Sequence, residues 1–537
     1  MQSSVKWHQT WSARPELERQ RLSEQVARTR QDASAPRVLL ATGLSGYPLG
    51  SLIESTLAAA LTMRGASVDV LICDGLLPAC QQSDFGDFDA PGIRFGEQRK
   101  CDKCFTQGAS CYAPLGVTVH RYSDWVTSDE RALAKAMAAE VRMEDVPTFK
   151  WNGLGVGEHA YAGALRYFAR GDLREERGAE PVVRRYLEAS LLTALATSRL
   201  LEDQHYEVAC FHHGIYVPQG VVGEVCRQQG VRVVNWNPAY RDRCFIFSHD
   251  DSYHRTMLSE PTEVWENIEW SAARQQETEA YLASRRQGSG DWIWFHPEPE
   301  VRQGGILRAV GADPSRPVVS LLTSVAWDAR LHYPSSAFDT MGDWIHDTVA
   351  YFGEHPDRQL VIRIHPAEIS GNIPSRQTVL ADLAAQFPTL PPNVFVIPPN
   401  SGLSTYDLID ASQSVLVYNT KTGIEIAARG VPVVVAGEAW IRNKGFSIDA
   451  ESRQGYRRIL DNLPSSTRLP ESLRQRALKY AYHFFFRRMI PLEFVRSREK
   501  FVFELDVDDL ASLEPGRSPG LDCICRGILD GTPFIFG

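Results

Sequence analysis

The chain has 537 residues, of which 43% are hydrophobic and 23% are charged, so it holds enough apolar material for two α/β domains of ordinary size. Its 57 lysines and arginines are outnumbered by 66 aspartates and glutamates, which gives a formal net charge of −9. Because no dense basic tract occurs either, the sequence argues against nucleic acid as a partner. Residues 1–36 are polar, which predicts an N-terminal helical arm rather than a secretory signal, and we expect a cytoplasmic protein.

Four apolar, mostly β-branched segments in the first half predict buried strands separated by helices, a pattern typical of a parallel sheet. These segments are 37–42, 67–73, 207–211 and 231–236. We therefore expect a Rossmann-like domain over residues 37–250. It carries a cysteine-rich insertion at about 76–112 that lacks strand and helix signals.

A glycine-rich loop, GLSGYPLG, follows the first of these strands. Ligands of open α/β sheets bind at the carboxyl ends of the strands, so we expect this loop to contact an anion or an acceptor molecule. Its spacing matches neither the dinucleotide fingerprint nor the Walker loop. The alternative is a tight turn that binds nothing. The candidate residues of this loop are Gly43, Ser45, Gly46 and Tyr47.

Two candidate catalytic bases lie in other loops of the first half. His213 follows the third strand in the sequence FHHGIY, and imidazole titrates near neutral pH, which suits proton transfer. Glu158 opens a helix after the turn WNGLGVG and can act as a carboxylate base. The alternatives are that the histidine only orients its loop by hydrogen bonds and that Glu158 only caps its helix.

The ten cysteines include the closely spaced Cys101, Cys104 and Cys111, with Cys73 and Cys80 upstream. Two thiolates from one turn can reach a single ion, and two further ligands complete a tetrahedral site. An iron–sulfur cluster and reduced thiols without a metal are the alternatives, whereas disulfides are disfavoured without a secretory signal. We predict that a structural zinc ion is held by Cys80, Cys101, Cys104 and Cys111.

The second half repeats the alternation of strands and helices. Its buried-strand segments are 317–324, 359–365, 393–398, 415–418 and 431–437. We expect a second Rossmann-like domain over residues 316–470 and a helical connector over residues 251–315 between the two domains. Residues 471–537 are predicted to form a C-terminal helix and tail.

The tail contains the run FFFRR at 484–488, for which the sequence allows two interpretations. In the first, the aromatic rings bury against the N-terminal domain while the arginines face water. In the second, the run contacts the inner face of a membrane.

Residues 414–437 predict a strand, a polar turn, a short helix and a second strand. Unpaired N–H groups and the positive dipole end at a helix N-terminus favour phosphate. Thr420 and Thr422 add hydroxyl donors, and Gly423 permits close approach. Glu425 can accept hydrogen bonds from the two hydroxyls of a ribose. The alternative is an ordinary βαβ unit with a capped helix.

Other strands of the second half also end in polar residues. Thr323 and Ser324 suit phosphate oxygens, and Asn419 opens the turn described above. Arg363 and His365 lie on alternate residues of one strand, so they point to the same face and can both donate to a diphosphate. The recurrence of such residues after successive strands predicts a nucleotide site at this sheet edge.

These residues also carry a family resemblance. The segments RIHP (363–366), YNTKTGIE (418–425) and GVPV (430–433) make the second half resemble the donor domain of bacterial capsule and surface polysaccharide glycosyltransferases of the GT-B type. The segment from Lys479 to Pro491 is similar to a tail of that family, and the resemblance covers residues 205–495. It implies two facing Rossmann-like domains, a nucleotide-activated sugar held by the C-terminal domain, and an acceptor approached from the N-terminal one. Arg363 stands where some members have lysine.

The expected function is therefore transfer of a sugar from a nucleotide-activated donor to a hydroxyl of a saccharide or lipid-linked saccharide. No D-x-D motif stands in a convincing loop, so we expect no catalytic cofactor and stabilisation of the leaving group by hydrogen-bond donors. A nucleotide-sugar epimerase or hydrolase of the same fold is one alternative. A non-catalytic module that binds nucleotide or glycan is another.

Overall fold

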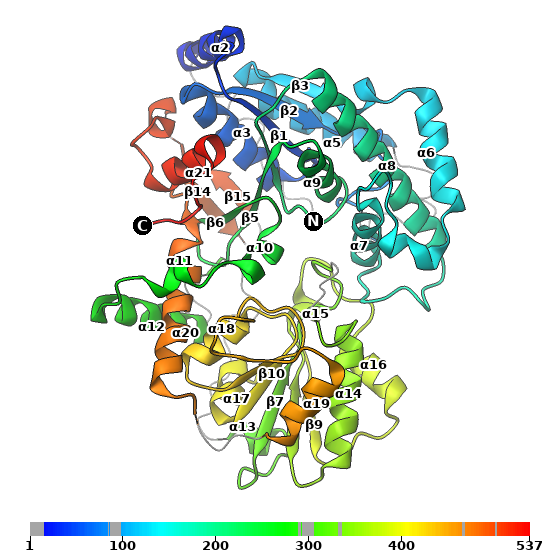
Figure 1. The fold of residues 1–537 in the computed structure, drawn as a ribbon, viewed down its shortest axis with the longest axis vertical. Helices are drawn as coiled ribbons and strands as arrows, with labels where there is room; N and C mark the ends of the chain where they lie inside the picture. The colour runs from blue at the N-terminus through cyan, green and yellow to red at the C-terminus, as the bar shows by residue number, and fades with distance from the viewer. Residues whose placement is uncertain are drawn as a thin grey trace. The chain divides into compact units, whose positions relative to one another are not determined.

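The computed structural model describes residues 16–83, 85, 98–287, 291–292, 305–330, 336–463, 468–499, 502–507 and 509–537. The chain divides into two compact units, each with its own sheet (Figure 1). Unit 1 consists of Met1–Phe168, Leu173–Thr256 and Arg487–Gly537, and unit 2 consists of Ala169–Asp172 and Met257–Phe486. Two α/β units with parallel strands confirm the predicted fold class.

The sheet of unit 1 has the strand order β13-β6-β5-β4-β1-β2-β3. Its parallel strands are β1 (Arg37–Gly43), β2 (Ser67–Ile72), β3 (Thr118–Arg121), β4 (Val208–His212) and β5 (Arg232–Pro238). β6 (Cys244–His249) and β13 (Ile490–Pro491) add antiparallel pairs. The sequence predicts β1, β2, β4 and β5. It does not reveal β3, because this edge strand is only half-buried and lacks a continuous apolar run.

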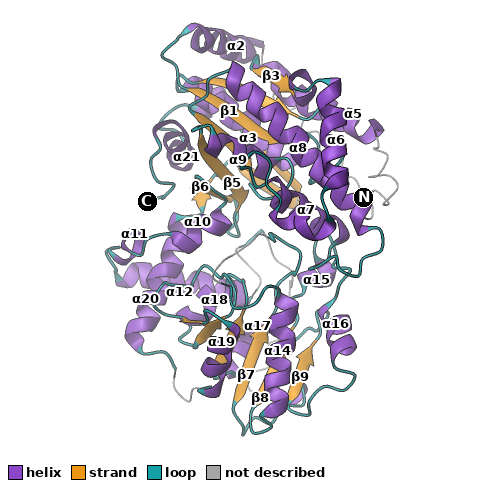
Figure 2. Cartoon of the chain, turned by 45° about the vertical axis from the view of Figure 1, so that its right-hand side comes forward, coloured by secondary structure: helices purple, strands orange, loops and turns teal. Residues whose placement is uncertain are grey.

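Helices pack around this sheet (Figure 2). The helix α3 (Pro48–Met63) is buried from Leu49 to Thr62, because it is apolar almost all round. Within the predicted N-terminal arm, the structure describes the helix α2 (Glu16–Gln31), and residues 1–15 lie outside the described residues. The other helices in this part of the chain are α6 (Ser128–Glu140), α7 (Val156–Phe168), α8 (Ala179–Asp203), α9 (Gln219–Gln228) and α10 (Tyr253–Ser259).

The cysteine-rich insertion differs from the prediction, because it contains the helix α5 (Gln98–Tyr112). Three cysteines of α5, at positions 101, 104 and 111, share one stripe of the helix at spacings of three and seven residues. Cysteine behaves as a small apolar residue in such a stripe, so the three cysteines contribute to the apolar face of a helix. The sequence did not predict this helix because the cysteines were considered only as metal ligands. The helix packs against α3 and β2.

The predicted tail also needs correction, since residues 487–537 belong to unit 1. Ile490 pairs with Phe245, so β13 extends the sheet of unit 1. The helix α21 (Pro519–Asp530) buries Leu521, Ile524 and Ile528 and packs against β4 and β13. A two-residue strand gives no sequence signal, so the return of the chain could not be predicted. The strands β14 (Val495–Glu499) and β15 (Val502–Leu505) form a separate antiparallel pair.

The sheet of unit 2 is parallel throughout and has the order β12-β11-β10-β7-β8-β9. In chain order this is the 3-2-1-4-5-6 arrangement of a Rossmann fold, whose order reverses between β7 and β10. The strands are β7 (Val318–Leu322), β8 (Gln359–Arg363), β9 (Val394–Ile397), β10 (Ser414–Val417), β11 (Val433–Val435) and β12 (Ile448–Asp449). All five predicted strands of the second half are confirmed.

The core of unit 2 gathers large side chains such as Trp344, Tyr418 and Tyr456 against the β-branched strands. Its helices include α14 (Met341–Glu354), α15 (Ala367–Ser370), α16 (Val379–Gln386), α17 (Thr405–Ala411), α18 (Thr422–Ala428), α19 (Arg453–Asp461) and α20 (Glu471–Tyr482). The predicted connector supplies α11 (Glu263–Glu266), α12 (Ala272–Arg286) and α13 (Ile306–Ala309). These helices belong to unit 2 rather than to a separate linker, and α12 packs against α20.

The run 484–488 differs from both of its predicted interpretations. Phe484 and Phe485 are fully buried inside unit 2, where their rings lie 5.3 Å from Trp440 and 4.9 Å from Tyr281. Arg488 is buried too and donates to the carbonyl oxygen of Phe247 at 3.1 Å. These two aromatic rings are therefore not a membrane-facing surface. Among the described residues, no helix is long and apolar enough to cross a membrane.

Candidate functional site

The switch point of unit 2 brings together polar side chains from three strand ends. Ser324, after β7, donates a hydrogen bond from Oγ to Oδ1 of Asn419, after β10, at 2.5 Å. Thr323 accepts the backbone N–H of His365, after β8, at 2.9 Å. Ligands of open α/β sheets bind where the strand order reverses, which here lies between β7 and β10. The predicted residues Thr323, Ser324, His365 and Asn419 are therefore neighbours at the expected place.

The imidazole of His365 is oriented to donate a hydrogen bond. Its Nδ1 accepts the N–H of Ala367 at 3.1 Å, so in the neutral ring the proton sits on Nε2. Burial, followed by the charges of Lys421 and Arg363, lowers the pKa of His365 to about 4. At neutral pH this ring is an uncharged donor beside a lysine, an arrangement suited to a phosphate oxygen.

The turn after β10 is organised by its two threonines. Thr420 Oγ1 accepts the N–H of Thr422 at 3.3 Å and lies 3.1 Å from the Thr422 hydroxyl. The hydroxyls thus brace the first turn of α18. A Cβ at Gly423 would lie 2.7 Å from Cδ1 of Ile441, so the glycine also lets that side chain pack closely. The predicted close approach of an anion to Gly423 stays a prediction.

Arg363 is not placed to bind a diphosphate. The side chain is 2% exposed and donates to the carbonyl oxygens of Pro398 at 2.5 Å and Ser401 at 3.3 Å, and to Oγ1 of Thr405 at 3.3 Å. Burial lowers the pKa of Arg363 to about 10. The alternation rule failed because β8 ends at Arg363, so His365 lies beyond the strand, while the Arg363 side chain contacts the loop after β9.

Glu425 is also committed within the protein. It is 1% exposed, accepts a hydrogen bond from Tyr406 at 2.5 Å, and forms ion pairs at 3.1 Å with Lys421 and with Arg285 of α12. Burial raises the pKa of Glu425, but the charges of Arg285 and Lys421 outweigh it and lower the pKa to about 2. Arg285 also pairs closely with Asp291. The predicted ribose contact of Glu425 is therefore replaced by a buried ion network.

Sequence reasoning missed Lys421, the cation of this sheet edge. Its side chain is 14% exposed, the residue stands between Thr420 and Thr422 in the sequence, and its charge adds to burial in lowering the pKa of His365. The ion pair with Glu425 holds the ammonium in place, and this i,i+4 spacing was visible in the sequence. Lys421, rather than Arg363, is the positive charge next to the switch point.

In unit 1, the switch point lies between β1 and β4. The loop after β1 brings the Tyr47 ring within 4.7 Å of His212, the last residue of β4. His213 follows with a φ of 67°, donates its N–H to the carbonyl oxygen of Trp236 at 3.0 Å, and has its ring 4.9 Å from Tyr216. Nδ1 of His213 is buried without a hydrogen-bond partner among the described residues. The predicted glycine-rich loop and the predicted base His213 therefore lie at the same sheet edge of unit 1.

His213 is an uncharged base at neutral pH. Burial, and then the charge of Arg166, lowers the pKa of His213 to about 3. A neutral imidazole with an unpaired nitrogen can take a proton from a hydroxyl. The ring of His254 stacks at 5.8 Å from the His213 ring.

The glycine-rich loop is fixed from behind by α5. The N–H of Gly46 donates to Sγ of Cys104 at 2.9 Å, and Gly43 lies against Tyr122. Ser45 is 3% exposed and packs against Gly108, where a Cβ would lie 2.0 Å from the Cβ of Ser45. Its hydroxyl therefore faces the helix, and Tyr47 is the loop residue that reaches the histidines.

Glu54 is a further buried carboxyl group at this edge that sequence reasoning did not select. It is 2% exposed and accepts hydrogen bonds from Thr42 and from Nε1 of Trp236, the latter at 3.2 Å. Thr42 in turn accepts the N–H of His212 at 2.8 Å. Burial raises the pKa of Glu54 to about 7, against the effect of these hydrogen bonds. The carboxyl group thus links the end of β1 to the histidine pair.

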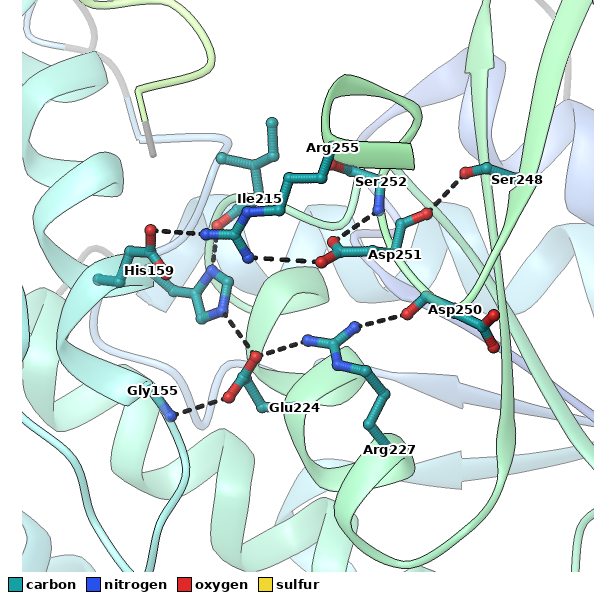
Figure 3. A network of polar contacts seen from close by, with 11 residues as sticks. Gly155, His159, Ile215, Glu224, Arg227, Ser248, Asp250, Asp251, Ser252 and Arg255 are labelled. Carbon is teal, nitrogen blue, oxygen red and sulfur yellow. Dashed lines mark hydrogen bonds and ion pairs between the residues drawn. The ribbon is translucent and has the colours of Figure 1, made fainter. Parts of the chain in front are cut away.

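The other predicted base, Glu158, forms an ion pair with Arg255 at 2.8 Å. Arg255 also lies 3.4 Å from Asp251, and nearby Glu224 accepts the N–H of Gly155 at 2.9 Å (Figure 3). The carboxylate of Glu158 thus belongs to a network of paired charges. Of the two predicted bases, His213 has the better geometry for proton transfer.

The predicted zinc ligands do not form one group. Cys104 and Cys111 are two helical turns apart, about 10 Å along α5, which is too far for one tetrahedral ion. Burial raises the pKa of Cys73 to about 12, and the charges of Cys80 and Cys101 add to this effect. Within the described part of the chain, no three His, Cys, Asp or Glu side chains are arranged to hold a metal ion.

Comparison with known families decides what the second half resembles. Residues 315–477 match the family of capsule polysaccharide biosynthesis proteins. This segment contains the strands β7 to β12, the switch point and Lys421. The predicted family resemblance is therefore confirmed for the part of the chain that carries its motifs. No curated protein matches the chain.

The chain is also similar to solved structures of low sequence identity. One is a KpsC beta-Kdo 2,4 transferase of Thermosulfurimonas dismutans, with 14% identity, a TM-score of 0.33, and coverage of 51% of this chain and 79% of that chain. A beta-Kdo 2,7 transferase of the same organism has 11% identity, a TM-score of 0.30, and coverage of 53% and 79%. A UDP-GlcNAc 2-epimerase of Neisseria meningitidis has 11% identity, a TM-score of 0.25, and coverage of 83% and 95%.

Proposed function

We propose that the protein is a glycosyltransferase of surface polysaccharide biosynthesis, which moves a sugar from a nucleotide-activated donor to a hydroxyl of a saccharide or lipid-linked saccharide. The main support is the switch point of unit 2, where Ser324, Asn419 and His365 gather beside Lys421. This arrangement lies within the segment that matches the capsule polysaccharide biosynthesis family. Unit 2 is accordingly the donor-binding unit.

The leaving group of such a reaction is a nucleoside phosphate, whose developing charge needs donors and cations. In our proposal, Lys421 and Nε2–H of His365 supply them, and Thr420 adds a hydroxyl. No step of this proposal requires a metal ion, because the ammonium and the N–H groups act directly on the phosphate oxygens.

The acceptor hydroxyl must lose its proton during transfer. We assign this role to His213, because its Nδ1 lacks a partner among the described residues and its ring lies next to His212, which in turn lies next to Tyr47, at the sheet edge. Tyr47 supplies an aromatic face at the same sheet edge of unit 1. Unit 1 is accordingly the acceptor-binding unit.

The test is a thermal-shift screen against nucleotides and nucleotide sugars, followed by an assay for nucleotide release with and without acceptor saccharides. We expect one nucleotide class to stabilise the protein and Lys421→Ala to weaken its binding by about 10- to 100-fold, the value of one charge-assisted hydrogen bond. The matched control is Lys150→Ala, which removes an exposed lysine. Release without any acceptor indicates an epimerase or hydrolase, and binding without turnover indicates a binding module.

A further inference from the structure

One carboxyl group stands alone in an apolar helix of unit 1. Glu54 is the only charged residue of α3, whose sequence is PLGSLIESTLAAALTM, and it is almost completely buried. No cation is among the groups that act on its pKa. Burying a carboxylate without a counter-charge costs free energy, so an apolar side chain would be favoured at this position on stability alone. The presence of a carboxyl group here therefore requires an explanation.

Oε1 of Glu54 accepts two hydrogen bonds, and both donors also hold the backbone of the histidine pair. The first donor is the Thr42 hydroxyl, whose oxygen accepts the N–H of His212 at 2.8 Å and whose single proton is therefore directed to Glu54. The second donor is Nε1 of Trp236 at 3.2 Å. The carbonyl oxygen of Trp236 accepts the N–H of His213 at 3.0 Å. Glu54 thus anchors the residues that bind both histidine N–H groups.

The rings of the same residues pack against one another. The ring of His212 lies 4.7 Å from that of Tyr47 and 4.8 Å from that of Trp236, and 5.2 Å from the ring of His213. Tyr47 is the residue that precedes the first turn of α3, the helix that carries Glu54. One helix therefore contacts the histidine pair twice, through an aromatic ring at its start and through a carboxyl group within it.

The backbone of His213 needs such support. Its φ of 67° lies in the left-handed region, which is unfavourable for a residue other than glycine. Residues in this region persist only when the surrounding structure holds them there. The hydrogen bond to Trp236 is one such contact, and Trp236 is fixed by Glu54. Loss of the carboxyl group is therefore expected to loosen the turn that presents the His213 ring.

Glu54 is also the group of this edge that changes its charge near neutral pH. Burial raises the pKa of Glu54 to about 7, against the effect of its hydrogen bonds. Burial moves the pKa values of the neighbouring titratable groups out of the range from pH 5 to 8, upward for the tyrosines and the cysteine and downward for the histidines. These groups are Tyr47, Tyr112, Cys210, His212 and His213.

We propose that Glu54 is a positioning residue of the acceptor edge, which holds the histidine pair in place through Thr42 and Trp236. The inference rests on the proposed function, in which His213 takes the proton of the acceptor hydroxyl. An ionised carboxylate accepts stronger hydrogen bonds than a neutral carboxyl group. The histidine pair is therefore held more firmly above pH 7 than below it.

The first test measures the position of His213 without any substrate. Diethyl pyrocarbonate acylates uncharged imidazole, and mass spectrometry of the fragmented peptide separates His213 from His212. His213 itself stays uncharged from pH 5 to 8, so its own titration does not change the rate. After correction for hydrolysis of the reagent, we expect acylation of the full chain to become about fivefold faster as the pH falls through 7, as weaker hydrogen bonds at Glu54 predict.

Glu54→Gln keeps the size of the side chain and an oxygen acceptor but cannot ionise. We expect this variant to show the faster acylation at every pH. Thr42→Val removes the hydroxyl at nearly constant size and is expected to have the same effect. Because the two residues act through one hydrogen bond, the double variant is expected to be no faster than the faster single variant. The matched control is Glu188→Gln, which alters a partly buried carboxylate that pairs with Arg185 on α8.

The second test measures turnover as acceptor-dependent release of nucleotide. Glu54→Gln is expected to be about fivefold slower than the wild type at pH 8 and equal to it at pH 6, with unchanged nucleotide affinity because Glu54 belongs to unit 1. The proposal is overturned if acylation of His213 by diethyl pyrocarbonate keeps its change near pH 7 in Glu54→Gln. It is also overturned if Glu54→Gln and Thr42→Val only lower the melting temperature. If acylation responds as expected but no nucleotide sugar is turned over, the positioning of His213 is supported and the proposed function fails.

Discussion

Charged side chains at the donor edge differ in whether their partners lie within the protein. Arg363 and Glu425 are buried and paired with neighbouring protein groups, so they stabilise unit 2. Lys421 forms an ion pair with Glu425, but its side chain remains 14% exposed, so the pair positions the ammonium without burying it completely. Sequence alone identified the sheet edge but could not tell these roles apart, since burial and pairing depend on residues such as Arg285 that are far away along the chain.

Arg363→Lys is expected to destabilise the protein by about 2–3 kcal/mol, because a lysine cannot reach the carbonyl oxygens of Pro398 and Ser401 together. Urea unfolding measures this change. Nucleotide affinity is expected to stay near that of the wild type. Unchanged stability combined with lost nucleotide binding would restore the diphosphate role that the sequence suggested.

Glu425→Ala is expected to cost about 3–5 kcal/mol of stability, since it leaves two buried cations short of a partner. The pKa of Glu425 falls from 4.5 to about 2 on folding, so its contribution is complete above pH 4.5 and is lost as the pH falls toward 2. The pH at which Glu425→Gln unfolds, compared with that of the wild type, measures this loss of stability in acid. A variant with the same acid midpoint as the wild type would show that the network contributes little.

His213→Asn is expected to slow transfer by about 10²- to 10⁴-fold, the usual value of a general base, while donor affinity is retained. Asparagine is the conservative choice because it tolerates the positive φ of this position. The folded pKa of about 3 keeps the ring neutral, so the base should not titrate in the rate profile between pH 5 and 8. A variant that retains wild-type turnover would remove His213 from the mechanism.

At the scale of elements, the strands with continuous apolar runs were predictable and the irregular parts were not. β1 and β10 show buried β-branched runs that end in polar turns. β3 is a half-exposed edge strand, and β13 has only two residues, so neither carries a periodic signal. The helix α5 was missed because its apolar stripe consists largely of cysteines.

The cysteines of α5 allow a direct test of the predicted zinc site, which stays a prediction. Metal analysis of the purified protein, with its absorption spectrum, distinguishes zinc, an iron–sulfur cluster and reduced thiols. If a metal is present, Cys73→Ser and Cys104→Ser are expected to lose it, and Cys111→Ser is the matched control that keeps it, because Cys111 lies two turns from Cys104. A metal-free wild type would leave Cys104 as the sulfur that holds Gly46 of the glycine-rich loop.

At the scale of the whole molecule, two Rossmann-like units present different chemistry at their switch points. Unit 2 offers a lysine and an N–H donor, which suit a phosphate leaving group. Unit 1 offers a neutral imidazole and an aromatic ring, which suit an uncharged hydroxyl acceptor. The family resemblance implied this division, whereas the return of residues 487–537 to unit 1 required the structure.

The central claim is sugar transfer. Its most direct test uses the nucleotide sugar that the protein binds best, labelled in its sugar, and measures how much label enters saccharide or lipid-linked saccharide acceptors. We predict labelled product only with an acceptor present, a strongly reduced rate for Lys421→Ala and for His213→Asn, and a wild-type rate for Lys150→Ala. Acceptor-independent release of free sugar or an epimer, at rates insensitive to His213→Asn, would contradict the account.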